Sequence, residues 1–158
     1  MTFQRIAIIG LGLLGGSIGL AVREFLPDAR TTGFDLKSEH RRAAAARGLV
    51  DRVCDTAAEA VSEADLVIFC VPPGAMGDAA RAVAKTLPPG ALVSDVGSCK
   101  QSIASALAEA LPGHAIIPAH PVAGTENSGP DAGFAHLFRN RWCIVTPEEN
   151  ADPHLLTA

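Results

Sequence analysis

The sequence predicts an α/β fold with a doubly wound, mostly parallel sheet, and three observations support this prediction. Short apolar runs alternate with longer segments of helical periodicity, as in parallel sheets whose strands are joined by helices. Two of these runs, residues 6–9 and 66–71, are apolar throughout, which is typical of strands covered on both faces. A glycine-rich turn at residues 10–15 joins the first run to the first helical segment. We expect right-handed crossovers between the strands.

The composition describes one globular domain and excludes several classes of protein. Of the 158 residues, 48% are hydrophobic and 19% are charged, which is ordinary for a folded domain. The net charge of −4 and the lack of a basic block give no support for nucleic-acid binding. Glycine or proline interrupts the apolar runs before the roughly 18–20 residues that a membrane span needs. No secretory signal pattern is visible at the N-terminus. We therefore expect a cytoplasmic protein that binds neither nucleic acid nor membrane.

The four cysteines, Cys54, Cys70, Cys99 and Cys143, are widely spaced and include no CxxC pair. They predict neither a zinc site nor a disulfide framework, and we expect no metal. Cys54 and Cys70 lie in apolar runs and are predicted to be small core residues. Cys99 lies at a predicted helix start, where it is either an activated thiol or an ordinary helix-start residue.

The glycine-rich turn is the strongest functional signal in the sequence. In a strand–turn–helix unit each glycine of a GxGxxG motif has its own role. Gly10 permits the tight turn, Gly12 lets the backbone approach a pyrophosphate, and Gly15 lets helix and strand pack closely. The helix that begins near Leu13 and Leu14 offers free N–H groups and a partial positive charge to the pyrophosphate. This pattern predicts a Rossmann-type dinucleotide-binding domain, although glycine turns also occur as plain turns.

The helix after this turn should pack on the sheet through an apolar stripe. The side chains that recur at helical spacing are Leu14, Ile18, Ala21, Val22 and Phe25.

Asp35 is the candidate for recognising the adenosine ribose. It ends a predicted strand at residues 31–35 and lies 20 positions after Gly15. An acid at this place receives the ribose hydroxyls of NAD and repels the extra phosphate of NADP. Lys37 would partly offset that repulsion, and aspartate also ends strands without any ligand. We expect NAD as the cofactor, with NADP less favoured.

The remaining elements follow from local signals. Helices are expected at 38–47, from the capping box of Thr56 and Glu59 onward, at 75–87, and from Ser98 to 111. Strands are expected at 50–54, 66–71, 91–94, 115–119 and 142–146. Gly48 is placed to cap the first of these helices, and Ser98 with Gln101 repeats the capping-box spacing.

Two residues at the end of the central strand are candidate cofactor contacts. Val71 ends the apolar run and Pro72 follows it, and cofactors lie at the carboxyl ends of strands in open α/β sheets. Termination of the strand explains the same residues without a ligand.

Residues 120–129, HPVAGTENSG, show neither helical nor strand periodicity and are expected to form a loop at the ligand-binding edge. His120 is the best candidate for a catalytic base, because histidine titrates near neutral pH. Pro121 restricts its backbone. A structural role for His120 is the alternative. The other histidines, His40, His114, His136 and His154, are expected to be solvated.

Four motifs together resemble the prephenate/arogenate (cyclohexadienyl) dehydrogenases of tyrosine biosynthesis. They are GLGLLGGSIGLA at 10–21, FD at 34–35, DVGSCK at 95–100 and HPVAGTENSG at 120–129. The resemblance covers essentially the whole chain and corresponds to that family's N-terminal cofactor domain. It implies NAD-dependent oxidative decarboxylation of prephenate to 4-hydroxyphenylpyruvate, or of arogenate to tyrosine.

The resemblance also implies roles for individual residues. His120 takes the place of the family's catalytic histidine, which deprotonates the ring hydroxyl while hydride passes to the nicotinamide and carbon dioxide leaves. Ser98 takes the place of a serine that hydrogen-bonds near the histidine and the substrate hydroxyl. Glu126 takes the place of an active-site acid linked to substrate access, and Thr125 is a further substrate-binding candidate. The alternatives are that Ser98 only caps a helix, which it can also do while serving the site, and that Glu126 is a solvated loop acid.

Three cations have open roles. Lys100 belongs to the DVGSCK motif but is equally explained as a surface charge. Arg139 and Arg141 either steer an anionic substrate or lie on a solvated face.

Residues 1–150 are expected to form the dinucleotide-binding domain, and residues 151–158 the start of a helix that leads to a further domain. The resemblance implies that this further domain is helical, forms a homodimer, closes the cleft and supplies an arginine to a small-molecule substrate. We expect it to lie outside the sequence. Two alternatives stay open: a dehydrogenase of an amino-substituted prephenate in secondary metabolism, and a non-catalytic NAD-binding fragment.

Overall fold

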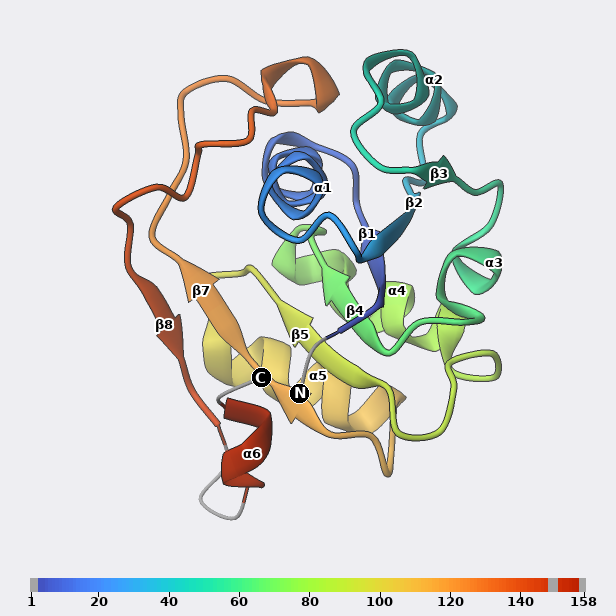
Figure 1. Cartoon of the computed structure of the whole chain (residues 1–158). Coiled ribbons are helices and arrows are strands. Elements are labelled where there is room, and N and C mark those ends of the chain that lie inside the picture. The colour runs from blue at the N-terminus through green and yellow to red at the C-terminus, as the bar shows by residue number, and fades with distance from the viewer. Residues whose placement is uncertain (1–2, 148–150, 157–158) are drawn as a thin grey trace.

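A six-stranded parallel sheet forms the centre of the molecule (Figure 1). The computed structural model describes residues 3–147 and 151–156. The strand order is β3-β2-β1-β4-β5-β6, and all neighbouring pairs are parallel. The strands are β1 (Arg5–Ile9), β2 (Arg30–Phe34), β3 (Arg52–Val53), β4 (Leu66–Phe69), β5 (Leu92–Asp95) and β6 (Ile116–Ile117). The predicted doubly wound parallel sheet is confirmed.

Helices cover both faces of this sheet (Figure 1). On one face lie α1 (Leu13–Phe25) and α2 (Ser38–Arg47), and on the other lie α3 (Ala57–Val61), α4 (Met76–Val83) and α5 (Lys100–Ala110). Because successive residues of a strand point to opposite faces, β1 contributes to both cores. Ala7 and Ile9 pack on the side of α3 to α5, and Ile6 and Ile8 pack on the side of α1 and α2.

Helix α1 packs through its glycines and through part of the predicted apolar stripe, since Val22 is buried and Ile18 packs against the same core. Its buried residues are Gly15, Gly16, Ser17, Gly19 and Val22. A Cβ atom at Gly19 would lie 2.1 Å from the carbonyl oxygen of Leu49, so the backbones are too close for a side chain there. Phe25 is 56% exposed and its ring lies 6.0 Å from that of His136. The prediction that Phe25 packs on the sheet is therefore wrong.

Helix ends follow local signals in two cases and depart from them in two others. Gly48, with φ of 59°, caps α2, and the Thr56 hydroxyl accepts the N–H of Glu59 at the start of α3. The predicted helix 75–87 is shorter: a 3₁₀ turn η1 (Pro73–Ala75) precedes α4, which ends at Val83, and residues 84–87 form a turn and a bend. Ser98 does not cap α5: the N-cap residue is Cys99, and its side chain makes no capping hydrogen bond.

His120 lies in a strand, where the sequence predicted a loop. The predicted strand 115–119 is split at Pro118, because proline cannot donate to a ladder. The chain continues as β7 (Ala119–Pro121), which pairs antiparallel with β8 (Cys143–Val145) in a separate sheet. In this register His120 faces Ile144. A 3₁₀ turn, η2 (Pro130–Ala132), lies between the two strands in the sequence.

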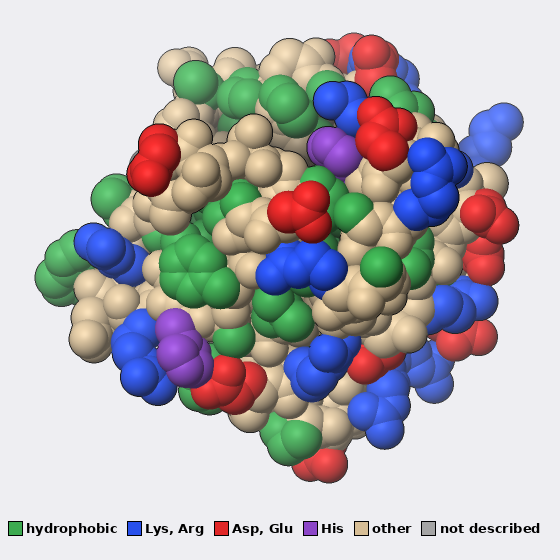
Figure 2. All heavy atoms as spheres, turned by 90° about the horizontal axis from the view of Figure 1, so that it is seen from above, with side chains coloured by type: hydrophobic (Ala, Val, Ile, Leu, Met, Phe, Trp, Pro, Cys, Tyr) green, Lys and Arg blue, Asp and Glu red, His purple; other side chains and the backbone are tan. Residues whose placement is uncertain are grey.

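The last described element is α6 (Pro153–Leu156), which falls within the helix start predicted at 151–158. Residues 157 and 158 lie outside the described part of the chain. None of the described helices has the length and apolarity needed to cross a membrane. Acidic and basic side chains lie close together over the face shown in Figure 2, so this face carries mixed charge.

Candidate functional site

The glycine turn lies at the carboxyl end of β1 and opens directly into α1. Gly10 has a φ of 102°, a conformation that glycine adopts without strain. A Cβ atom at Gly15 would lie 1.9 Å from the carbonyl oxygen of Gly10, which places helix and strand in direct backbone contact. No heavy atom lies within 4 Å of a Cβ atom built on Gly12, so its outer side is open. The turn has the form expected of a pyrophosphate-binding loop.

The N-terminus of α1 has N–H groups that no side chain caps. Gly12 is the N-cap residue, and the first turn contains no acidic side chain. Free N–H groups and the helix dipole favour an anion at this position. Leu13, Leu14 and Gly15 are the first three residues of the helix.

Asp35 lies beside this turn, just beyond β2. One carboxylate oxygen accepts the N–H of Leu11 at 2.9 Å, and the other accepts the N–H of Lys37 at 2.9 Å. The ring of His40 also approaches, with Nδ1 3.3 Å from Asp35 Oδ2. His40 is half-buried, so the expectation that it is solvated is wrong. The carboxylate is thus fixed at the edge of the glycine turn.

A cavity of about 590 Å³ joins these groups. Of the predicted cofactor contacts, five line it: Gly10, Gly12, Asp35, Val71 and Pro72. Leu13, Leu14 and Gly15 are not among its lining residues. Phe34, Leu36, Lys37 and His40 complete the side formed by the end of β2. The cavity has space for a nucleoside between the ends of β2 and β4.

The ring of His120 lies farther along the same edge, next to Val96, which follows β5. Its Nδ1 is 3.4 Å from the carbonyl oxygen of Val96. Because a carbonyl oxygen only accepts, a neutral ring makes this hydrogen bond as the tautomer with the proton on Nδ1, and its Nε2 can then accept another proton. The side chain is half-buried.

A buried ion pair contacts the backbone of Ala119, the residue before His120, and the sequence did not predict it. Lys100 Nζ is 2.6 Å from Oδ1 of Asp95 and also donates to the carbonyl oxygen of Ala119 at 2.6 Å. Asp95 has no exposed side-chain area, and Lys100 is 17% exposed. The reading of Lys100 as a surface charge is therefore wrong. The only sequence signal was that both residues belong to one short motif.

The remaining predicted substrate residues are exposed. Ser98 lies in the turn before α5, with its hydroxyl 4.0 Å from the thiol of Cys99. Thr125 accepts the N–H of Asn127 at 3.2 Å, and Glu126 lies exposed beside it. No hydrogen bond in the described structure joins Ser98, Thr125 or Glu126 to His120.

The two arginines before β8 differ in their surroundings. Arg139 and Arg141 are both exposed. Arg141, together with Trp142 and Phe138, lines an apolar cavity of about 270 Å³ between α1 and the β7–β8 sheet.

Two cysteines are unsuited to nucleophilic chemistry. Burial raises the pKa of the Cys70 thiol far above its usual range, and the nearby Asp95 carboxylate acts in the same direction. Burial also raises the pKa of the Cys54 thiol, with Arg52 opposing it. Within the described residues, no three His, Cys, Asp or Glu side chains gather as metal ligands.

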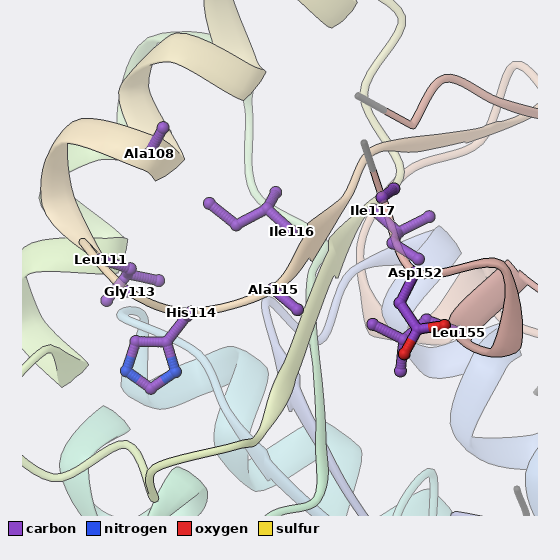
Figure 3. Close-up of a pocket in the computed structure, with 10 residues that line it drawn as sticks. Ala108, Leu111, Gly113, His114, Ala115, Ile116, Ile117, Asp152 and Leu155 are labelled. Carbon is purple, nitrogen blue, oxygen red and sulfur yellow. The ribbon is translucent and has the colours of Figure 1, made fainter. Parts of the chain in front are cut away.

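A cavity of about 300 Å³ lies away from this edge, between the end of α5, β6 and the C-terminal segment (Figure 3). His114, Ala115 and Ile116 lie on one side of it and Asp152 and Leu155 on the other. His114 precedes β6, so the cavity is at the amino end of that strand. Ligands of open α/β sheets bind at the carboxyl ends, which favours the glycine-turn edge as the functional site.

The fold and the glycine-turn edge define a Rossmann-type dinucleotide-binding domain. A family model described as "Prephenate dehydrogenase, nucleotide-binding domain" matches residues 18–158, and the chain belongs to this family.

Individual relatives agree with this assignment. The cyclohexadienyl dehydrogenase of Zymomonas mobilis is 47% identical over 146 residues, which are 92% of this chain and 50% of that protein. The crystal structure of Synechocystis arogenate dehydrogenase superposes with a TM-score of 0.87 at 29% identity, covering 98% of this chain and 54% of that one. Prephenate dehydrogenase from Aquifex aeolicus, in complex with hydroxyphenyl propionate and NAD+, gives 0.89 at 26% identity, covering 99% and 55%. The chain thus spans about half the length of the relatives it matches.

Proposed function

We propose that this chain is the cofactor-binding part of an NAD-dependent dehydrogenase that oxidatively decarboxylates prephenate or arogenate. The observation that supports it most is the placement of His120 relative to the glycine turn. Ile9, Phe69 and Asp95 are in register across β1, β4 and β5, so Gly10 and Val96 end their strands at one level. Two strand spacings separate them, about 10 Å along the edge. A dinucleotide bound at the turn could therefore extend along this edge toward His120.

Each group at this edge would have its own role in binding or proton transfer. Gly10, Gly12 and the first N–H groups of α1 would hold the pyrophosphate, and Asp35 the adenosine ribose. NAD+ would supply the hydride acceptor. His120 would take the proton of the substrate ring hydroxyl at Nε2, while its Nδ1–H stays on Val96. Loss of carbon dioxide makes the ring aromatic, so the protein mainly positions the reactants and moves one proton.

The finer assignments belong to the same proposal. Asp35 favours NAD over NADP, because its carboxylate would face the 2′-phosphate. Ser98, Thr125 and Glu126 are proposed to contact the substrate, and their exposure leaves them accessible to it. The names of the relatives support a cyclohexadienyl substrate, either prephenate or arogenate. A homodimer is proposed through residues outside this sequence.

The proposal is tested in two steps. Calorimetric titration of the 158-residue chain with NAD+ should show saturable binding. For turnover, residues 1–158 are joined to the part of the Zymomonas mobilis relative that lies outside the alignment. This fusion protein should form NADH with prephenate or arogenate. In it, His120→Asn should lower kcat by about 10²–10⁴ with little change in the Kd for NAD+.

His136→Asn is the matched control, since His136 is an exposed histidine beside Phe25. A fusion protein that binds NAD+ but turns over neither substrate would contradict the proposed reaction. Retention of most of the kcat by the folded His120→Asn variant would assign the proton to another group.

A further inference from the structure

The Asp95–Lys100 ion pair has a place in the fold that a surface salt bridge does not have. Asp95 is the last residue of β5, a strand inside the sheet, and its carboxylate is buried. Lys100 is the first residue of α5, and its ammonium reaches back to both carboxylate oxygens. Burying such a pair removes two charges from water, so the pair by itself is a weak source of stability. Stability is therefore a weak explanation for this buried pair, and its contacts with neighbouring groups indicate another role.

Both members of the pair bond the backbone of Ala119, the residue before His120. Lys100 donates to the carbonyl oxygen of Ala119 at 2.6 Å, and the N–H of Ala119 donates to Asp95 Oδ1 at 3.3 Å. The two polar groups of one residue in a strand point to the same side, and those of the next residue point to the other. The carbonyl oxygen of Pro118 faces β8, since it accepts the N–H of Thr146 at 2.9 Å. The N–H and the carbonyl oxygen of Ala119 consequently point away from β8 and toward β5.

Ala119 makes these bonds just beyond the point where the backbone ladder between β5 and β6 ends. The ladder between β5 and β6 ends at Ser94 and Ile117. Beyond Pro118 the chain belongs to a different sheet, whose partner strand is β8. The ion pair thus links β7 to the main sheet where the backbone ladder does not.

The same carboxylate also fixes the group that the His120 ring contacts. Asp95 Oδ2 accepts the N–H of Gly97 at 2.7 Å, which closes the turn around Val96. The carbonyl oxygen of Val96 is the acceptor 3.4 Å from His120 Nδ1. One ion pair therefore sets both the backbone before His120 and the acceptor of its ring.

We propose that Asp95 and Lys100 are positioning residues that set the orientation and tautomer of the His120 ring. Charge-assisted hydrogen bonds are shorter and stronger than neutral ones, and here three of them meet the two segments that hold the ring. Neither residue is proposed to touch the substrate. The inference rests on the proposed role of His120 as the base, but its main test needs no turnover.

The test uses nuclear magnetic resonance of the 158-residue chain. In the wild type, the ¹⁵N shifts of His120 should report one neutral tautomer, protonated at Nδ1. The Lys100 ammonium should give a protected signal with a cross-peak to Ala119. In Lys100→Met, amide exchange at Ala119 should rise about tenfold or more, because the bond from Lys100 to the Ala119 carbonyl oxygen is lost and the segment opens more often. The His120 shifts should then become an average of two tautomers.

Matched variants separate positioning from folding. Lys85→Met removes an exposed lysine and should change neither signal. Lys100→Arg keeps the charge and should restore the single tautomer at least in part. Asp95→Asn combined with Lys100→Met removes both charges, so no unpaired buried charge is left if the single variant fails to fold.

Two results would overturn the inference. One is a wild-type chain in which the Lys100 ammonium exchanges freely and His120 populates both tautomers. The other is a folded Lys100→Met or double variant with unchanged His120 shifts. In the fusion protein, Lys100→Met should lower kcat by up to about 10²-fold while the KM for NAD+ is unchanged, as expected for a misplaced base. If His120→Asn keeps its turnover there, the proposed role of His120 as the base fails even where the tautomer result stands.

Discussion

A Cβ atom on Gly15 and one on Gly12 would meet opposite surroundings, although both glycines belong to the same turn. At Gly15 the added atom would lie 1.9 Å from the Gly10 carbonyl oxygen, whereas at Gly12 it would meet no heavy atom within 4 Å. We predict that Gly15→Ala lowers the free energy of unfolding by about 1–3 kcal/mol or more, because helix and strand must separate. Gly12→Ala should leave stability nearly unchanged and weaken NAD+ binding, since its methyl group enters the pyrophosphate position.

Chemical denaturation measures the first effect and calorimetry the second. Equal stability of the two variants would show that α1 can shift away from β1 without loss.

Asp35 combines a structural contact with the proposed choice of cofactor. Its carboxylate holds the N–H groups of Leu11 and Lys37, and the same group would face a 2′-phosphate. We predict that Asp35→Ser narrows the difference in Kd between NAD+ and NADP+ and also lowers stability by about 1–3 kcal/mol. Asp78→Ser, at an exposed acid that lines the same cavity, is the control and should do neither. Tighter binding of NADP+ than NAD+ by the wild type would contradict the assignment.

At the scale of elements, the turn η2 is held by long-range side-chain bonds. The Arg47 guanidinium, at the end of α2, donates to the carbonyl oxygens of Pro130 and Gly133. The buried Ser17 hydroxyl accepts the N–H of Phe134 at 3.0 Å. We predict that Arg47→Met raises hydrogen exchange in residues 129–137 by about tenfold and leaves the central sheet unchanged.

Exchange mass spectrometry of Arg47→Met beside Arg42→Met provides the measurement. Arg42 is an exposed arginine of the same helix. The same increase in both variants would mean that helix charge, rather than the bonds to η2, protects this segment.

Elements whose ends depend on neighbouring residues could be predicted from the sequence. Helix α2 spans 38–47 as expected, because Gly48 takes the left-handed conformation that ends it. The placement of Gly10 and Asp35 beside one cavity was also predictable, since both residues have fixed places relative to their strands. The strand at His120 was not, because a strand of three residues that follows one proline and ends on another is too short to show alternation. Burial of Lys100 depends on Ala119, 19 positions away, and no local pattern records that contact.

At the scale of the whole molecule, apolar side chains remain exposed on the β8 side. Trp142 is 83% exposed, and Ile144 and Val145 are 51% and 45% exposed. Exposed apolar surface of this kind is typical of a face that meets another protein segment. The relatives are about twice as long as this chain, so they have further residues with which such a face can pack.

The last prediction concerns the activity of the 158-residue chain by itself. The groups proposed to bind NAD+ lie between Gly10 and Pro72 on a well-packed sheet, so we expect the chain to fold and bind the cofactor. Thr125 and Glu126, proposed to contact the substrate, lie exposed. In an open site the substrate is poorly oriented and stays in water, which weakens every charged contact. We predict a kcat/KM at least about 10²-fold below that of the fusion protein. Assays of NADH formation with both proteins at equal cofactor saturation test this, and comparable values would mean that residues 1–158 contain a complete site.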